Sequence, residues 1–277
     1  MKYQNNKKIM KKNVILPELK IDINKGKWHN RILIATPATG LVRMEWVHAR
    51  YSQIIPTNWS QVELTQWINS YVPMQYLLPD AENLIAKVAI EGNFEWVLSI
   101  EQDNVLPKNA FFKINEYMKE KKVPIVSGLY FTKSNPPEPI LYRGRGNGAF
   151  EDWKLDDKVW VDGIPFGFTL MHTSILKALW DESPEYEING QITRRVFDLP
   201  DKNWGSPEEG YGAIRGTTDL AWCTRIMENN IFEKAGWKEY KNKKYPFLVD
   251  TTINIGHIDN NGRVFPLGGI PNKYLKK

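Results

Sequence analysis

The chain has 277 residues, of which 42% are hydrophobic and 25% charged, a composition typical of a globular protein. The one cysteine, Cys223, excludes an intrachain disulfide and any zinc site built from several cysteines. No apolar run approaches the roughly 18 residues that a membrane helix needs, and the basic N-terminal segment lacks the apolar core of a signal peptide. We therefore expect no membrane span and a cytoplasmic location.

The net charge is +5, and much of the excess comes from lysines near the two ends of the chain. Such lysines either lie on solvated, frayed termini or attract a polyanion such as nucleic acid. Residues 1–27 are polar and rich in Lys and Asn. We predict that they form a basic N-terminal arm.

Residues 28–135 alternate short apolar runs with amphipathic segments, and we expect them to form an α/β half. The predicted strands are 31–37, 95–100 and 123–131, and the predicted helices are 41–55, 81–92 and 109–122. Because the strands lack clean alternation and helices join them, a parallel sheet covered on both faces is indicated. The expected inner side of helix 41–55 carries Leu41, Met44, Val47 and His48. The expected inner side of helix 109–122 carries Phe112, Ile114 and Met118.

Residues 136–277 have a different pattern and form the second half of the same domain. Residues 158–172 alternate and contain glycines, which predicts antiparallel strands. The other expected features are helices at 173–180, capped at Thr173 or Ser174, and at 217–230, capped near Thr217, a strand pair at 245–258, and loops at 143–157 and 181–215.

Polar side chains follow the predicted strands of the first half. Parallel sheets bind ligands outside the carboxyl ends of their strands, where Thr36-Pro37, Glu101-Gln102-Asp103 and residues 128–130 fall. Glu101 and Asp103 are one residue apart, so in extended backbone both can face the same way. A hard divalent cation would offset their repulsion; the alternative is a strand end capped by solvated acids.

Two further residues extend this candidate site. His257 lies between a glycine and a polar turn after an apolar segment. An imidazole joining two carboxylates would give a mixed N/O ligand set that suits Mn²⁺, although a histidine here can also simply be packed or exposed. Asp219 falls in the first turn of a predicted helix. It is either an acid that favours the helix dipole or a general base.

The order of seven segments resembles the GT-A nucleotide-sugar glycosyltransferases, especially family-2-like members found in bacteria and phages. The segments are ILIATP, AENLIA, SIEQDNVLP, VSGLYF, VDGIPFGFTLM, TTDLAW and GHI. The resemblance runs from about residue 31 to residue 258. It implies a Rossmann-like, mostly parallel central sheet flanked by helices, with a smaller antiparallel subdomain on the acceptor side within residues 136–277.

The resemblance also implies roles for particular residues. Asp103 would hold Mn²⁺ or Mg²⁺ on the diphosphate of a sugar donor, which we expect to be a UDP-sugar. His257 would complete the metal shell, and Glu101 would lie near the ribose or the metal. Asp219 would be the base of an inverting transfer. The other implied donor-binding residues are Thr36, Pro37, Asn83, Gln102, Lys133, Gly163 and Gly167.

Three positions depart from the family pattern. Glu101 replaces the usual first Asp of the motif, and Thr218-Asp219 keeps only the second acid of a common Glu-Asp pair. Glu82-Asn83 stands where relatives often have Arg-Asn, which removes a cation that could balance the diphosphate. Candidate replacements for that cation are Lys133, Arg143 and Arg145.

Other readings stay open at this stage. A nucleotidyltransferase is disfavoured because TPATGLVR, after the first strand, has one glycine and one arginine. A non-catalytic nucleic-acid-binding protein and an inactive sugar-nucleotide-binding relative are the remaining alternatives. The acceptor is expected to be a saccharide or surface polymer, or a hydroxylated base in phage-type DNA. The residues expected to shape the acceptor side are Trp153, Tyr186, Arg194, Arg195, Trp204 and Tyr211.

Overall fold

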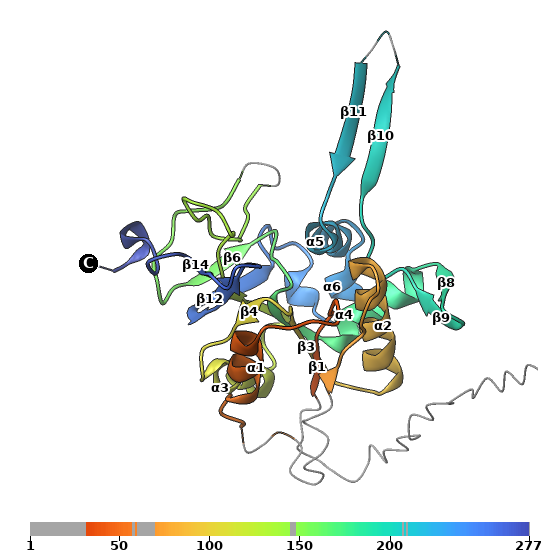
Figure 1. Ribbon diagram of the computed structural model, residues 1–277. Helices are drawn as coiled ribbons and strands as arrows, with labels where there is room; N and C mark the ends of the chain where they lie inside the picture. Colours follow the sequence, from red (N-terminus) through yellow and green to blue (C-terminus); the bar gives the residue numbers. More distant parts are fainter. Residues whose placement is uncertain are drawn as a thin grey trace, which may run out of the picture.

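A computed structural model describes residues 32–56, 59, 70–144, 148–206, 208 and 210–276. The predicted arm at 1–27, and Arg145, lie outside these ranges. A seven-stranded sheet in the order β2-β1-β3-β7-β5-β12-β6 forms the centre of the molecule (Figure 1). Its strands in chain order are β1 (Ile32–Ala35), β2 (Ser70–Tyr71), β3 (Trp96–Ile100), β5 (Ile125–Leu129), β6 (Lys158–Val161), β7 (Phe168–His172) and β12 (Phe247–Asn254).

The central sheet is mostly parallel, as the sequence predicts. β1 runs parallel to β2 and β3, and β12 runs parallel to β5. β7 lies antiparallel between β3 and β5, and β6 is antiparallel at the edge, which confirms the antiparallel strands expected in 158–172. Because β6, β7 and β12 belong to the second half of the sequence, both halves build one sheet.

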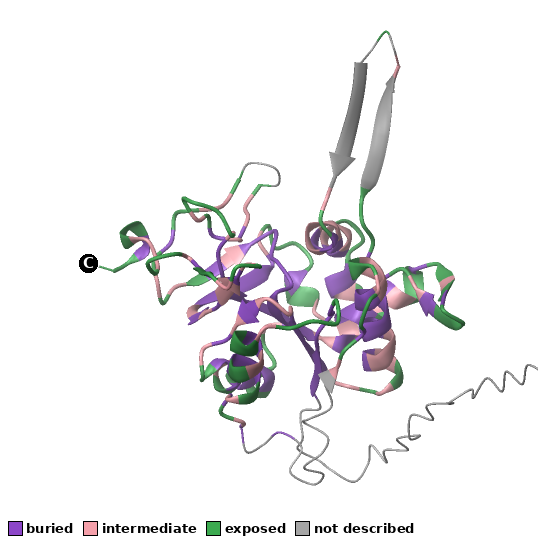
Figure 2. Ribbon diagram, viewed as in Figure 1, coloured by how far each residue is buried: buried purple, intermediate pink, exposed green. Residues whose placement is uncertain are grey.

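Helices cover both faces of this sheet. Successive side chains of a strand point to opposite faces, so β1 contributes Leu33 and Ala35 to one core, and Ile32 and Ile34 to the other. Figure 2 shows the buried residues concentrated on the central strands and the inner sides of the helices. The first core includes α2 (Leu78–Glu91), α4 (Thr173–Glu182), α5 (Thr218–Glu228) and α6 (Ile231–Lys234); the second includes α1 (Met44–Tyr51) and α3 (Ala110–Glu120).

The prediction of which side of α1 is buried is wrong. Leu41 and Met44 are 89% and 74% exposed, whereas Trp46 and Arg50 are buried. Polar contacts select the buried side, because Trp46 Nε1 donates a hydrogen bond to the Glu101 carbonyl at 2.9 Å. A periodicity of apolar residues does not contain that information.

Two other helix details differ from expectation. In α3, Ile114 and Met118 are buried as predicted, but Phe112 is 51% exposed. The cap of α4 is His172 rather than Thr173 or Ser174, since its Nδ1 accepts a hydrogen bond from the Ser174 amide at 3.2 Å. Thr217 is the N-cap residue of α5, as predicted.

None of the helices in the described part of the chain is long and apolar enough to cross a membrane.

Within the described residues, three small antiparallel sheets accompany the central one. The segment predicted as a loop at 181–215 contains two hairpins, and the second projects away from the body above α5 (Figure 1). The first hairpin turns at Asn189-Gly190, where both residues have positive φ, the signature of a tight hairpin turn. The strands are β8 (Glu185–Ile188) with β9 (Gln191–Arg194), β10 (Asp201–Ser206) with β11 (Gly210–Arg215), and β4 (Asn104–Val105) with β13 (Gly256–Ile258) and β14 (Val264–Phe265).

Candidate active site

The small β14-β13-β4 sheet brings Asp103 beside His257. β4 starts immediately after Asp103, and its Asn104 is paired with His257 in β13. The Ile258 amide also donates a hydrogen bond to the Asp103 carbonyl at 2.7 Å. As a result, His257 Nε2 lies 3.4 Å from Asp103 Oδ2. The sequence predicts this meeting of two distant residues, but not the two-residue strand that produces it.

The imidazole of His257 is fixed by its surroundings. Its Nδ1 lies 2.8 Å from the Phe131 carbonyl oxygen, and since a carbonyl only accepts, Nδ1 carries the hydrogen and Nε2 is the free ring nitrogen of the neutral form. The Tyr130 ring meets the imidazole edge-on at 5.4 Å. Gly256 leaves no room for a side chain, because a Cβ there would lie 2.5 Å from Val264 Cγ1. Nε2 is therefore held toward Asp103.

Asp103 is a half-buried, ionised carboxylate, and one of its oxygens has no hydrogen-bond partner. Burial opposes its ionisation, but the neighbouring His257 and Lys133 outweigh burial and hold the pKa of Asp103 below its ordinary value. Lys133 Nζ forms an ion pair with Oδ2. Oδ1 is buried without any hydrogen-bond partner. A ligand that supplies positive charge would satisfy this oxygen.

These residues fit a divalent cation as a two-ligand site. The Asp103 carboxylate and the His257 Nε2 offer a mixed O/N donor set of the kind that Mn²⁺ accepts, and no protein group bonds to the buried Oδ1, which could bind a cation. Among the described residues, no three His, Cys, Asp or Glu side chains converge on one metal position. Glu101 therefore does not complete a three-ligand set, and the other positions would belong to water and phosphate oxygens.

Backbone hydrogen bonds fix Glu101 where it lines both cavities. Its amide donates to the Gly167 carbonyl at 2.9 Å, while its own carbonyl accepts from Trp46. Gly167 must be glycine, since a Cβ would lie 2.4 Å from the Tyr130 hydroxyl oxygen. Burial, with the charges of Asp103 and Asp219 adding to it, raises the pKa of Glu101 to about 8.

A smaller cavity of about 410 Å³ lies beside this carboxylate pair. Thr39 and Gln102 close one side of it, because Gln102 Oε1 accepts from the Thr39 amide at 2.8 Å and Gln102 Nε2 donates to Thr39 Oγ1 at 3.0 Å. Thr36, by contrast, is buried and does not line the cavity. The lining residues are Pro37, Ala38, Thr39, Tyr76, Leu77, Leu78, Ala81, Glu101, Gln102 and Asp103.

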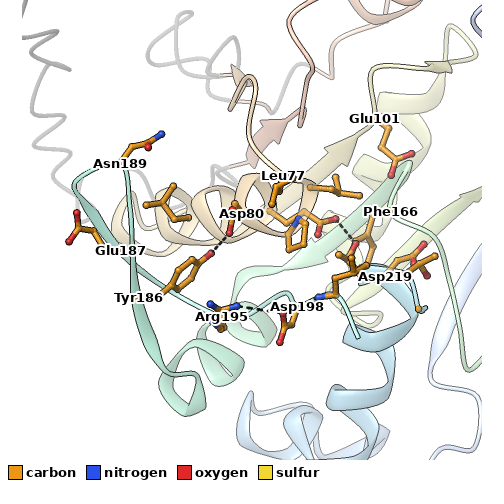
Figure 3. A pocket seen from close by; sticks show the side chains of 18 residues that line it. Leu77, Asp80, Glu101, Phe166, Tyr186, Glu187, Asn189, Arg195, Asp198 and Asp219 are labelled. Atoms are coloured by element: carbon orange, nitrogen blue, oxygen red, sulfur yellow. Dashed lines mark hydrogen bonds and ion pairs between the residues drawn. The ribbon is translucent and has the colours of Figure 1, made fainter. Parts of the chain in front are cut away.

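A larger cavity of about 890 Å³ shares Leu77, Leu78 and Glu101 with the smaller one. Asp219 lines this cavity from the first turn of α5, and Figure 3 shows it with Glu101 and Phe166 among the lining side chains. The Leu220 amide donates to Asp219 Oδ1 at 2.8 Å. Burial nevertheless raises the pKa of Asp219, so this carboxyl group holds a proton more readily than an ordinary aspartate.

Glu82 is a third carboxyl group in the larger cavity, and sequence reasoning noted it only as the loss of an arginine. It is 5% exposed, and burial raises its pKa well above the usual value. Thr218 Oγ1 donates to Glu82 Oε1 at 3.3 Å, but Oε2 has no partner. Its position on the inner side of α2, next to α5, could not be read from a single acidic residue.

Several predicted residues belong to the framework around the cavities. Asn83 is buried, and its amide group binds the backbone N and O of Phe197 at 2.8 and 2.9 Å and the Tyr186 hydroxyl at 2.9 Å. Gly163 packs against Leu220, since a Cβ there would lie 2.8 Å from Leu220 Cδ2. Arg143 stacks on Phe150 and Tyr245 rather than reaching Asp103. The residues brought together around the two cavities are Pro37, Glu101, Gln102, Asp103, Lys133, Asp219 and His257.

Comparison with known proteins gives only distant structural likenesses. No family model matches the chain, and no curated protein matches it. The crystal structure of A197 from STIV is 13% identical, with a TM-score of 0.49 over 84% of this chain and 92% of that one. S. aureus TarS 1-349 in complex with UDP-GlcNAc is 13% identical, with a TM-score of 0.34 over 53% of this chain and 46% of that one. The corresponding complex with UDP is 12% identical, with a TM-score of 0.32 over 53% and 47%.

This chain therefore spans less than half of those TarS chains. At these identities and TM-scores the likenesses define no family.

Proposed function

We propose that the protein is a glycosyltransferase that moves a sugar from a nucleoside diphosphate sugar to an acceptor hydroxyl, with inversion at the sugar carbon. The observation that carries this proposal is the junction of two cavities at Glu101. One cavity borders the Asp103–His257 pair, and the other contains Asp219. A donor lying across the junction would have its diphosphate near Asp103 and its sugar carbon between Glu101 and Asp219.

The smaller cavity suits the nucleoside half of the donor, and we expect the donor to be a UDP-sugar. Its walls combine apolar groups, such as Pro37 and Leu77, with the amide of Gln102, the mixture that fits a base and a ribose. Lys133 brings a positive charge to the diphosphate side through its pairing with Asp103. Asp103 and His257 would hold Mn²⁺ or Mg²⁺ there, and the bound ion would supply Lewis-acid stabilisation of the charge on the leaving diphosphate.

Asp219 is the group that moves a proton. Its ionised carboxylate accepts the proton of the acceptor hydroxyl as that oxygen attacks the sugar carbon and the bond to the diphosphate breaks. The raised pKa of Asp219 strengthens it as a base toward a hydroxyl. Because the diphosphate lies on the Asp103 side and the acceptor enters through the larger cavity, attack comes from the face opposite the leaving group.

The acceptor hydroxyl belongs to a saccharide or surface polymer, or to a hydroxylated base of DNA. The basic N-terminal arm that could favour DNA lies outside the described residues.

Donor hydrolysis tests the proposal without knowledge of the acceptor. The protein is incubated with labelled UDP-glucose, UDP-GlcNAc or GDP-mannose and Mn²⁺, and the released sugar is measured. At least one donor should be hydrolysed, and Asp103→Ala should abolish that hydrolysis. Absence of hydrolysis for all donors, or equal hydrolysis by Asp103→Ala, would overturn the assignment.

A further inference from the structure

Acidic side chains outnumber basic ones in the lining of the larger cavity. Its only cation among the described lining residues is Arg195, and Asp198 lies 3.7 Å from its Nη1. The carboxyl groups come from α2, the tip of β3, the β8–β9 region and α5, so they surround the space rather than form one patch (Figure 3). These acidic residues are Asp80, Glu82, Glu101, Glu187, Asp198 and Asp219.

One oxygen atom of one of these acids lacks a hydrogen-bond partner. Glu82 is 5% exposed, lines the cavity, and has an Oε2 atom without any hydrogen bond. A buried polar atom of this kind is unfavourable until a ligand supplies a partner. Hydroxyl and ammonium groups can supply a hydrogen to either form of the carboxyl group, whereas a phosphodiester has no hydrogen to donate.

Tyr186 offers a flat surface within the same cavity. Its hydroxyl donates to Asp80 Oδ1 and accepts from Asn83 Nδ2, both at 2.9 Å, and the Arg195 guanidinium lies 4.6 Å from the ring centroid. The ring is therefore held in one orientation. Aromatic and apolar side chains, here with Phe166 as a further wall, contact the C–H faces of sugar rings, while carboxylates accept hydrogen bonds from sugar hydroxyls.

We propose that the larger cavity selects an uncharged or amine-bearing saccharide as the acceptor and excludes phosphate-bearing polymers, including DNA. This inference rests on the proposed function and narrows its acceptor. Like charges brought together across a binding surface oppose association, and opposite charges favour it. In the proposed function the donor diphosphate would avoid this repulsion, because it would lie beside Lys133, which is paired with Asp103.

Calorimetry with defined probes tests the inference separately from catalysis. The probes are a glucosamine trimer, an N-acetylglucosamine trimer, and a trinucleotide containing hydroxymethylcytosine, each titrated into the full chain loaded with UDP and Mn²⁺. We expect both saccharides to bind at least tenfold more tightly than the trinucleotide, with the amine-bearing trimer the tighter of the two.

A matched pair of double variants shows where the selectivity arises. In Glu187→Gln/Asp198→Asn the preference for the amine-bearing trimer over the N-acetylated one should fall about tenfold, because two cavity charges are removed. In Asp152→Asn/Glu228→Gln, with acids outside the cavity, the preference should persist. Tighter binding of the trinucleotide, or an equal loss in both variants, overturns the inference. If donor hydrolysis occurs and the trinucleotide binds best, the transferase proposal stands and only the acceptor class is wrong.

Discussion

Glu101 and Asp103 stand one residue apart, yet their environments drive their ionisation in opposite directions. The Asp103 carboxylate lies beside His257 and Lys133, which outweigh its burial and hold its pKa below the ordinary value. Burial and the neighbouring carboxylates of Asp103 and Asp219 raise the pKa of Glu101 to about 8. The sequence predicts both acids as site residues, but the difference depends on Lys133 and His257, which only the folded chain places beside one of the two.

Replacement of Asp219 tests its role as the base. Asp219→Asn should lower the rate of transfer by about 10²–10⁴-fold, because the amide cannot take the acceptor proton, while donor binding stays within about twofold. In the unaltered protein, the rate should fall as the pH drops through the raised pKa of Asp219, so that the acid limb lies above the range of an ordinary aspartate. Steady-state kinetics across pH measure both. Unchanged transfer by Asp219→Asn, or transfer with retained configuration, would contradict this role.

Replacement of Glu82 tests how much the ionisation of this buried carboxyl group lowers the free energy of unfolding. Its folded-state pKa lies above the unfolded value near 4.5, so ionisation opposes folding, and stability is lost as the pH rises through the folded-state pKa. Glu82→Gln removes that penalty and keeps an acceptor for Thr218. We expect its free energy of unfolding to exceed that of the unaltered protein by about 1–3 kcal/mol at pH 8 and to match it near pH 4, measured by urea denaturation. A less stable variant at pH 8 would contradict this account.

Short elements position the site, and they are the part that sequence patterns predict least well. The longer strands and helices follow from apolar runs, as β3 and α2 do. β4 has two residues, and no periodicity exists over such a length. The residues Asn189-Gly190 predict the turn of the β8–β9 hairpin. The position of this hairpin at the larger cavity, however, depends on hydrogen bonds from Asn83 to Phe197 and Tyr186, which join separate elements.

The attachment of the β8–β9 hairpin to α2 is testable through Asn83. Asn83→Ala removes two hydrogen bonds to the Phe197 backbone and leaves those buried groups unpaired, so the free energy of unfolding should fall by roughly 2–4 kcal/mol. Tyr186→Phe removes one hydroxyl at the edge of the same network and should lower it by only about 1 kcal/mol. Urea denaturation of both variants measures the difference. Equal losses would mean that Asn83 does not hold the hairpin.

Across the whole molecule, the site is formed because the two halves of the chain share one sheet. β7 and β12 of the second half lie on either side of β5 of the first, so Asp219 and His257 arrive at the same edge as Glu101 and Asp103. The order of the segments and their resemblance to a known family predict this mostly parallel sheet and the residues near its edge. Strand order and the position of Lys133 beside Asp103 depend on contacts that a single sequence does not contain.

The most direct test of the account is the cation dependence of UDP binding, measured by calorimetry with and without Mn²⁺. Mn²⁺ should tighten UDP binding at least tenfold in the unaltered protein, and Asp103→Ala and His257→Ala should each remove that gain. Asp152→Ala and His48→Ala, which alter an acid and a histidine outside both cavities, should retain it. If Mn²⁺ leaves UDP binding unchanged, or if Asp103→Ala keeps the full gain, then the Asp103–His257 pair does not hold a donor diphosphate and the central claim is wrong.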